Sequence, residues 1–454
     1  MIYLGERMII KKEVVIKSDW KCEGCEALFS RQGRDPPRSC MLCKKRVFLL
    51  VAERRDMVDF SDEENKLIDK YLKDDKLFNK ITEEEFDKQI VGEINTRKAI
   101  FLCAQGRLVS NAQIASYNLL ITSSAGAGKD YVTAKVLKIL PQESYVRKTR
   151  ISPTVFTYWH NSKYEPAWTW DGKVFYTEDI SENVLNSEVF KVMTSSGSQA
   201  TIVINQRAVD IDINGKPVAI TTTATSTPNP ELTRRFEFCN LDEGIDQTKE
   251  IMKRHSLFAS KGILPDYNED YTKAMSLLQR VKVKIPFAEL LDEYFPDKNI
   301  MMRTKYPRFL DFIKASCAFY QFQRTLDEDG YLLATEQDYE IAKIVMKKFA
   351  VNKYLIPLTI NQQKIIKFFE ENKDYSGSAQ EVLQKLNNFM ALKNFLNNLT
   401  LLNSYGLLET EMRLGEFNKQ IEVYKLSHYL RENNDNFDLP SFKEILKNRG
   451  LINE

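Results

Sequence analysis

Histidine is scarce in this sequence: only His160, His255 and His428 occur among 454 residues. They lie far apart without ligand spacing, so a histidine-based catalytic or metal site is not expected. No run approaches the ~18–20 apolar residues of a membrane span, and the first residues contain no apolar signal core. Long low-complexity tracts are also absent. We therefore expect a cytoplasmic protein with no membrane partner and roughly two to four domains.

Four of the seven cysteines form two C-x-x-C pairs near the start of the chain, and each pair places two thiols on one side of a tight turn. Two such turns can close a tetrahedron around Zn²⁺. Redox pairs or disulfides are the alternative, but they fit poorly in a chain that is expected to stay in a reducing compartment. A closed four-thiolate site would leave no open metal position, so its role would be structural. The predicted ligands are Cys22, Cys25, Cys40 and Cys43.

The segment NLLITSSAGAGKDYV, residues 118–132, predicts a buried strand, a loop of small residues and a helix that begins near Lys129. This order suits a nucleotide phosphate, because the loop backbone can approach closely and the helix N-terminus is partially positive. The fit to G-x-x-x-x-G-K-[ST] departs twice: Ser123 replaces the first glycine and Asp130 replaces the Mg²⁺-binding Ser or Thr. The predicted ATP-binding residues of this loop are Ser124, Ala125, Gly126, Ala127, Gly128, Lys129, Asp130 and Tyr131.

A second apolar segment, residues 174–176, predicts a buried strand that is followed by Glu178 and Asp179. Carboxylates at a strand end beside a phosphate loop can bind Mg²⁺ and activate the attacking water; the alternative is an acidic loop. The usual order of such a pair is Asp then Glu, and here it is reversed. We expect Asp130, Glu178 and Asp179 to share the Mg²⁺ site, with the carboxylate on the loop taking over part of the coordination.

Two alternating apolar runs, 208–213 and 217–223, flank Asn214-Gly215-Lys216, which predicts a β-hairpin that turns at Asn-Gly. Arg207 and Lys216, one at each candidate turn, are the basic residues best placed for a DNA backbone; solvated hairpin tips are the alternative. The threonine run 221–225 follows, and a threonine there could orient the lytic water. Thr223 is the catalytic candidate, with Thr221 and Thr225 left open.

In this order the motifs resemble a AAA+ ATPase of the hairpin-bearing replicative-helicase group. That group includes the minichromosome maintenance (MCM) helicases, the superfamily III helicases and primase-linked helicases of mobile elements. FDKQIVGEINTRKAIFLCAQG, SEVFKVMTSSGSQATIVI and LTRRF are similar to the segment before the core, the helix and hairpin, and the arginine-finger turn of MCM proteins. RTKYPRFLDFIKASCAF resembles the second-sensor helix and EDGYLLATEQDYEIAKIVMKKF the last lid helix.

The resemblance implies a ring, usually of six subunits, with ATP and Mg²⁺ at each interface and single-stranded DNA in the channel. Lys129 would bind phosphate, Arg235 would act on the neighbouring subunit's nucleotide with Arg234 beside it, and Arg308 (alternatively Arg303) would sense the nucleotide. Other replication proteins are possible further partners.

The C-terminal part, with three amphipathic helical segments and two strand segments, predicts a winged helix. The fold class is therefore multidomain α/β: a zinc ribbon, a AAA+ P-loop core with a helical lid, and a winged helix. The expected domains are a zinc module (1–56), an acidic, solvated helical linker (57–85), the ATPase core with its hairpin (86–260), the lid (261–352), the winged helix (353–430) and a helical tail (431–454).

The function that these patterns favour is ATP hydrolysis coupled to DNA translocation, as in a hexameric replicative helicase of an archaeal, plasmid or viral element. A DNA-bound loader, initiator or transposition regulator without unwinding activity is the main alternative. A nucleotide-binding scaffold that has lost turnover is a third. No primase carboxylate triad or nuclease motif is evident in the sequence.

Overall fold

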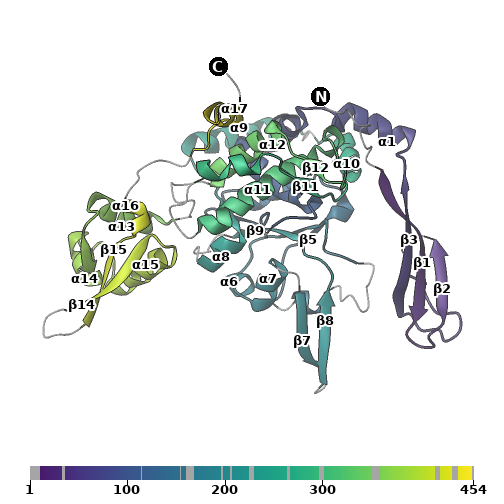
Figure 1. The fold of residues 1–454 in the computed structure, drawn as a ribbon, viewed down its shortest axis with the longest axis horizontal. Coiled ribbons are helices and arrows are strands. Elements are labelled where there is room, and N and C mark those ends of the chain that lie inside the picture. Colours follow the sequence, from purple (N-terminus) through teal and green to yellow (C-terminus); the bar gives the residue numbers. More distant parts are fainter. Residues whose placement is uncertain are drawn as a thin grey trace.

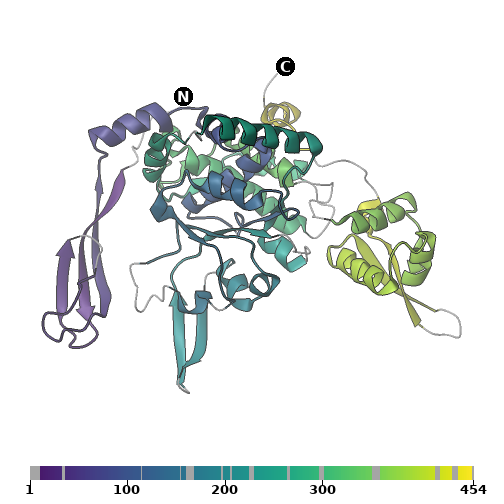
Figure 2. The same cartoon turned by 180° about the vertical axis from the view of Figure 1, so that it is seen from behind.

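The computed structural model describes residues 11–32, 36–113, 115–153, 155–159, 168–195, 198–204, 207–223, 230–262, 266–295, 301–349, 358–414, 420–431 and 438–451. Three parts extend from a central α/β body: an N-terminal sheet, the β7–β8 hairpin and a C-terminal module (Figures 1 and 2). Within these ranges no helix combines the length and apolar character needed to cross a membrane.

The N-terminal sheet is antiparallel, with strand order β2-β1-β3. Its strands are β1 (Lys12–Cys22), β2 (Leu28–Gln32) and β3 (Phe48–Val58). A small core of Trp20, Cys22, Cys40 and Phe48 lies at the cysteine end, where apolar area is too small to stabilise much by itself.

The acidic segment after this sheet is helical, as expected, but it is not a solvated linker. Its elements are α1 (Asp62–Leu67), the π-helical η1 (Ile68–Leu72), α2 (Leu77–Asn79), π-helical η2 (Lys80–Glu85) and the 3₁₀ turn η3 (Phe86–Lys88). One face is apolar, and Leu72, Phe78 and Ile81 are buried in the main core. Charged residues cover the opposite face, so the segment looks solvated when only its composition is considered.

The central sheet is parallel, with strand order β10-β4-β9-β6-β5. Its strands are β4 (Leu119–Thr122), β5 (Tyr145–Lys148), β6 (Val174–Thr177), β9 (Val218–Thr223) and β10 (Glu237–Cys239). The predicted strands before the phosphate loop and before the acidic pair are thus confirmed. Helices α3 (Ile94–Gln105) and α4 (Lys129–Leu137) accompany the sheet, with 3₁₀ turns η4 (Gly106–Leu108) and η5 (Gln142–Ser144). Because parallel strands end at one edge, β4, β6 and β9 deliver their following residues to the same place.

The hairpin lies one element earlier than predicted. It is formed by β7 (Ser198–Ile204) and β8 (Arg207–Ile213), after α5 (Val155–Tyr158), α6 (Glu182–Leu185) and α7 (Glu188–Met193). Asn214-Gly215 instead connects β8 to β9. Gly215 has a φ of +73°, and a Cβ there would lie 2.7 Å from the Asp171 backbone nitrogen. The glycine therefore permits close contact with another loop, where the Trp170 N–H donates to the Asn214 carbonyl (2.9 Å).

The region expected to be the lid continues the core of the ATPase body, because one apolar cluster includes side chains of both. The longer helices after the sheet are α9 (Ile245–Lys261), at the end of the expected core, and α10 (Glu269–Ser276), α11 (Met302–Phe319) and α12 (Glu336–Phe349) in the expected lid. Short elements are α8 (Pro230–Arg235), β11 (Val283–Lys284), η6 (Ala288–Leu290), η7 (Asp292–Tyr294), η8 (Gln321–Gln323) and β12 (Leu332–Leu333). The tail helix α17 (Phe442–Asn448) packs on α12, where Phe442 meets Tyr339.

The C-terminal module has its own core and an order of helix, strand, two helices and two strands. The elements are α13 (Ile360–Glu371), β13 (Ser376–Ser378), α14 (Ala379–Lys385), α15 (Leu392–Ser404), β14 (Leu408–Leu414), β15 (Gln420–Leu426) and the short α16 (His428–Arg431). The antiparallel sheet has the order β13-β15-β14. The three predicted helical segments and two predicted strand segments are present, and the short strand β13 is an addition to them. Residues 415–419, between β14 and β15, lie outside the described residues.

Candidate nucleotide-binding site

The phosphate loop occupies Ser123–Gly128, between β4 and α4, as predicted. Gly126 and Gly128 have φ values of +87° and +88°, and a Cβ at either would meet no atom within 4 Å. Glycine is therefore favoured at both positions by the backbone conformation, and not because neighbouring atoms leave no room for a side chain. Lys129 is the first residue of α4 and is only 7% exposed. The loop thus brings a lysine and the N–H groups of a helix N-terminus to one edge of the sheet.

Asp130, the residue that replaces the usual Ser or Thr, is linked to the neighbouring strand. The hydroxyl of Thr222, near the end of β9, donates a hydrogen bond to the Asp130 carboxylate. The same Thr222 oxygen accepts the N–H of Asp179 (2.8 Å), whose φ is +41°. Thr222 therefore connects the phosphate loop to the acidic pair. Burial raises the pKa of Tyr176, whose hydroxyl donates to the Asp130 carbonyl (3.3 Å).

Asp130, Glu178 and Asp179 line one cleft of about 800 Å³. The structure thus brings together the three carboxylates predicted to bind Mg²⁺. Their oxygens, with the Thr222 hydroxyl, are the hard ligands that Mg²⁺ prefers. Glu178 is already paired, because Arg147 Nε donates to its carboxylate (2.9 Å). Asp130 and Asp179 are therefore the better metal ligands of the three.

Among the threonines of the run 221–225, Thr222, which the sequence interpretation passed over, is the residue whose hydroxyl reaches Asp130. Thr222 and the predicted candidate Thr223 are both buried, and the catalytic role of Thr223 stays a prediction. Thr221 donates to the Thr177 carbonyl within the sheet (2.8 Å), and Thr225 lies outside the described residues. Successive side chains of a strand point to opposite faces. The sequence alone does not say which face of β9 lies toward the phosphate loop, so it could not identify the threonine that contacts Asp130.

Glu243, in the loop between β10 and α9, binds the first part of the phosphate loop at Ser124. Its carboxylate accepts the Ser124 N–H (2.7 Å) and the Ser124 hydroxyl (2.8 Å). These two bonds lower the pKa of Glu243. Ser123 is fixed as well, because its hydroxyl oxygen accepts the N–H of Leu241 (2.9 Å). Ser123, the first departure from the motif, therefore has a structural role that a glycine could not fulfil.

A second cleft, of about 810 Å³, lies beside the loop and is lined by Gly126, Ala127, Gly128 and Tyr131 together with α9. Its other walls come from residues 89–91 and from the α9 side chains Arg254, His255 and Phe258. Tyr131 is 46% exposed, and its hydroxyl donates to the Gln89 carbonyl (2.9 Å). An aromatic ring, an apolar wall and backbone groups beside a phosphate loop can accommodate a nucleoside.

Arg308, the predicted nucleotide sensor, is fully buried in an ion cluster. Its guanidinium donates to Glu237 (2.7 Å) and to the Arg234 carbonyl (2.8 Å), and Lys305 donates to the same carboxylate (2.6 Å). Burial alone would raise the pKa of Glu237, but these two cations bring it below its usual value. Arg308 therefore ties α11 to β10 and is not open to a nucleotide. Arg303, the alternative, is exposed.

The paired arginines of the predicted finger turn differ in surroundings. Arg235 donates to the Lys191 carbonyl and to the Ser195 hydroxyl (2.8 Å), and it pairs with Glu231 (3.4 Å). Arg234 has an exposed side chain. Arg235 thus holds α8 against α7, and Arg234 is the arginine that faces solvent.

The two predicted DNA-contacting residues are not equivalent. Arg207 opens β8 beside the hairpin turn, and its side chain lies outside the described part of the chain. Lys216 is not at a hairpin tip: it lies at the base, where its ammonium donates to the Ser195 carbonyl (3.2 Å).

Away from this site, the thiols of Cys22, Cys25, Cys40 and Cys43 lie within 4.8 Å of one another, so this group could hold a zinc ion. Glu26 and Lys44, each next to the second cysteine of its pair, have φ values of +60° and +62°. The Cys43 N–H approaches Cys40 Sγ (3.5 Å) and lowers the pKa of that thiol to about 6. A thiolate is the form that binds zinc.

Strand, glycine loop, buried lysine and carboxylate cleft together define a P-loop NTPase domain. The comparison with protein families agrees, because residues 60–282 match the family described as MTBMA_p00010 P-loop domain. The matched range contains the loop, the acidic pair and α9. It supports binding and hydrolysis of a nucleoside triphosphate with Mg²⁺. No curated protein matches the chain.

Proposed function

We propose that this protein is an ATP-dependent motor that translocates along single-stranded DNA as a ring, namely a hexameric replicative helicase of an archaeal, plasmid or viral element. The observation that carries the proposal is the β7–β8 hairpin, inserted between α7 and β9 of a P-loop domain. It extends away from the body (Figure 1). A hairpin joined directly to β9, the strand that contacts the nucleotide site through Thr222, can move when the nucleotide changes.

The C-terminal module supports the same proposal. Its order of helix, strand, two helices and two strands, with a β13-β15-β14 sheet, suits a winged helix. We propose that it contacts DNA or a second protein of replication. The four-cysteine module would bind Zn²⁺ and serve as a further contact surface.

The proposal is tested by ATP hydrolysis with and without single-stranded DNA, on wild type and on Lys129→Ala. We expect DNA to stimulate turnover and the substitution to abolish it, because Lys129 would bind the phosphates. Lys73→Ala is the matched control: this lysine is 56% exposed and pairs only with Asp69 among the contacts of the described residues. Turnover that DNA leaves unchanged would contradict a DNA motor.

A loader or initiator that assembles on DNA without unwinding it is the second candidate, and one observation favours it. Arg147 engages Glu178, which leaves a single carboxylate of the acidic pair for the water. A forked DNA duplex separates the two candidates. A motor unwinds it, and replacing 201–210 with two glycines should abolish unwinding while basal hydrolysis persists. A loader shows DNA-stimulated hydrolysis without strand separation.

A further inference from the structure

The strand pair β14–β15 of the C-terminal module ends in an open edge. The sheet order β13-β15-β14 leaves one side of β14 without a neighbouring strand among the described residues. Residues 410–414 are all exposed, and Met412 and Leu414 are 61% and 67% exposed. Figure 1 shows β14 at the outer end of the module, away from the central body. Proteins commonly block such edges with proline or lysine, and β14 contains neither, so this edge can accept another strand.

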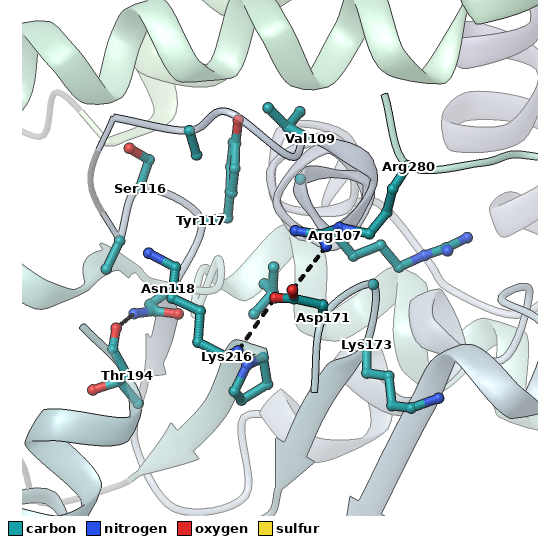
Figure 3. Close-up of a pocket in the computed structure, with 16 residues that line it drawn as sticks. Arg107, Val109, Ser116, Tyr117, Asn118, Asp171, Lys173, Thr194, Lys216 and Arg280 are labelled. Carbon is teal, nitrogen blue, oxygen red and sulfur yellow. Dashed lines mark hydrogen bonds and ion pairs between the residues drawn. The ribbon is translucent and has the colours of Figure 1, made fainter. Parts of the chain in front are cut away.

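The charges of this edge differ from those of a small cavity where the central strands begin (Figure 3). In the cavity, Arg280 pairs with Asp171 (2.9 Å) and the Lys216 ammonium donates to the Ser195 carbonyl (3.2 Å). Those groups therefore serve contacts within the fold. The edge of β14, in contrast, presents backbone groups and side chains of both charge signs to solvent.

The hydrogen-bond pattern identifies the residues of β14 whose backbone faces the open side. Strands β14 and β15 pair antiparallel, with Leu408 opposite Leu426. In the continuation of this register, the Ser427 N–H donates to the Leu407 carbonyl (3.1 Å). Because bonded pairs alternate along an antiparallel ladder, the odd-numbered residues of β14 bond to β15. The N–H and C=O groups of the even-numbered residues therefore point to the open side.

A second copy of β14 fits this edge, and the charges of the strand select one register. Within 410–414, Glu411 and Arg413 are the charged residues. In a two-fold antiparallel pair the same residue of both copies lies at the centre. With Met412 at the centre, Glu411 of each copy lies opposite Arg413 of the other, which gives two attractive pairs. A centre at Glu411 or Arg413 opposes like charges, and a centre at Thr410 opposes Glu411 to Glu409.

We infer that β14 pairs with β14 of a second copy of this chain, with Met412 at the centre. Glu411 and Arg413 are each 45% exposed and have partners in the module: Lys425 contacts Glu411 (2.6 Å), and Arg413 contacts Glu381 (3.0 Å). The pairing would keep these contacts, because it extends them into a row of alternating charge. The row runs from Glu381 and Arg413 of one copy to Glu411 and Lys425 of the other.

This pairing is two-fold, whereas the contacts of a ring run from head to tail. It would therefore join two rings or two single chains, and it does not rest on the proposed function. Five residues from each strand form a small interface, so we expect weak association of single chains. Several pairs formed at once between two rings would bind more tightly.

The first test is disulfide crosslinking of the full chain by oxidised glutathione. In Met412→Cys the two new thiols would face each other at a Cα–Cα distance of about 5.5 Å, within the range of a disulfide. Leu414→Cys is the matched control: Leu414 is more exposed, but its two copies would lie roughly 14 Å apart because each faces residue 410. Wild type gives the background from the native cysteines.

We expect Met412→Cys to form crosslinked dimers at least about tenfold faster than Leu414→Cys, since only the first pair is within disulfide distance. Equal rates, or faster crosslinking at residue 414, would overturn the inference. An absence of crosslinks at both positions, as expected if a strand of another protein covers the edge, would overturn it as well.

Two charge reversals, each added to Met412→Cys, test the register. Arg413→Glu alone opposes glutamates and Glu411→Arg alone opposes arginines, so each should crosslink about tenfold more slowly. A mixture of the two variants restores both attractive pairs between unlike chains and should recover the rate. The contacts with Glu381 and Lys425 stay lost in the mixture, so recovery can come only from the contact between copies. A mixture as slow as its components would show that the inferred register is wrong. Because the assay needs neither ATP nor DNA, its result is independent of whether the protein is a motor.

Discussion

Thr222 donates a hydrogen bond to the carboxylate of Asp130, the residue that stands where P-loops usually have a hydroxyl. A carboxylate at the start of α4 and a hydroxyl on the adjacent strand β9 thus lie together. Both oxygen types are present at the edge where a Mg²⁺–nucleotide complex would bind. This pairing accounts for Asp130 without requiring that the site has lost its activity.

Thr222→Val should impair Mg²⁺-dependent ATP hydrolysis, because it removes the hydroxyl and leaves Asp130 and the Asp179 N–H without this partner. Hydrogen bonds to charged groups contribute about 1.5–3 kcal/mol, so kcat/KM should fall about 10- to 100-fold. The measurement is hydrolysis across a Mg²⁺ titration. Thr222→Ser is the matched control and should keep most of the activity. Equal Mg²⁺ dependence in wild type and Thr222→Val would show that the Thr222–Asp130 pair takes no part in Mg²⁺ binding.

Glu243→Ala should weaken nucleotide binding, because the Ser124 N–H and hydroxyl lose their acceptor and the first limb of the loop is released. Glu243→Gln retains one acceptor oxygen and should lie between wild type and Ala. The pKa of Glu243 is lowered in the folded chain. The stabilisation that its carboxylate gives to the phosphate loop is therefore present at a pH above the ordinary glutamate pKa of about 4.3, and it is lost as the pH falls through the lowered pKa. A labelled nucleotide titrated at several pH values measures this. Identical affinities for Ala and wild type would show that the contact does not position the loop.

Arg308→Met should destabilise the fold rather than remove a nucleotide sensor. Removing one partner of a buried ion cluster typically costs about 3–5 kcal/mol, and here Glu237 would keep only Lys305. The free energy of unfolding in urea measures the loss, and nucleotide affinity of the folded fraction should be unchanged. The pKa of Glu237 is lowered in the folded protein. The cluster therefore stabilises the fold fully at a pH above the ordinary pKa of a glutamate, and this stabilisation is lost as the pH falls through the lowered pKa.

Arg303→Ala is the companion variant. Arg303 is exposed on the first turn of α11, so its replacement should change stability by less than about 0.5 kcal/mol. If α11 senses the nucleotide, this variant and not Arg308→Met should alter affinity. The reverse result, weaker binding with normal stability in Arg308→Met, would restore the role that the resemblance assigns to Arg308.

Local patterns were enough to predict much of this architecture. The strand before Ser123 and the helix from Lys129 follow from an apolar run, a glycine loop and a lysine in sequence. The two cysteine pairs predicted their own cluster. Both features depend on contacts between residues close in the chain or on a motif that determines its own geometry.

The errors arise where a distant contact decides the outcome. Asn214-Gly215 favours a hairpin locally, but Gly215 is needed for the approach to Asp171, more than forty residues earlier in the chain, and the hairpin forms between β7 and β8. Arg308 follows the pattern of a sensor helix, yet its partner Glu237 is on a sheet strand. Thr222 lies on β9 and Glu243 in the loop after β10, and neither residue belongs to a sequence motif that marks it as part of the site.

Gly24→Ala should weaken zinc binding by the four-cysteine group. A Cβ on Gly24 would lie 2.9 Å from Cys43 Sγ and 2.4 Å from Lys45 Cδ, so a thiol of the cluster or its neighbour must move. Overpacking costs about 1–3 kcal/mol, which corresponds to roughly 5- to 150-fold in zinc affinity. Glu26→Gly is the control, because glycine adopts the +60° φ of this position at no steric cost and should preserve binding. Zinc transfer to a coloured chelator measures both variants, and far-ultraviolet circular dichroism reports whether the N-terminal sheet survives metal removal. A Gly24→Ala protein that releases zinc like wild type would show that Cys43 Sγ is not held where the cluster places it.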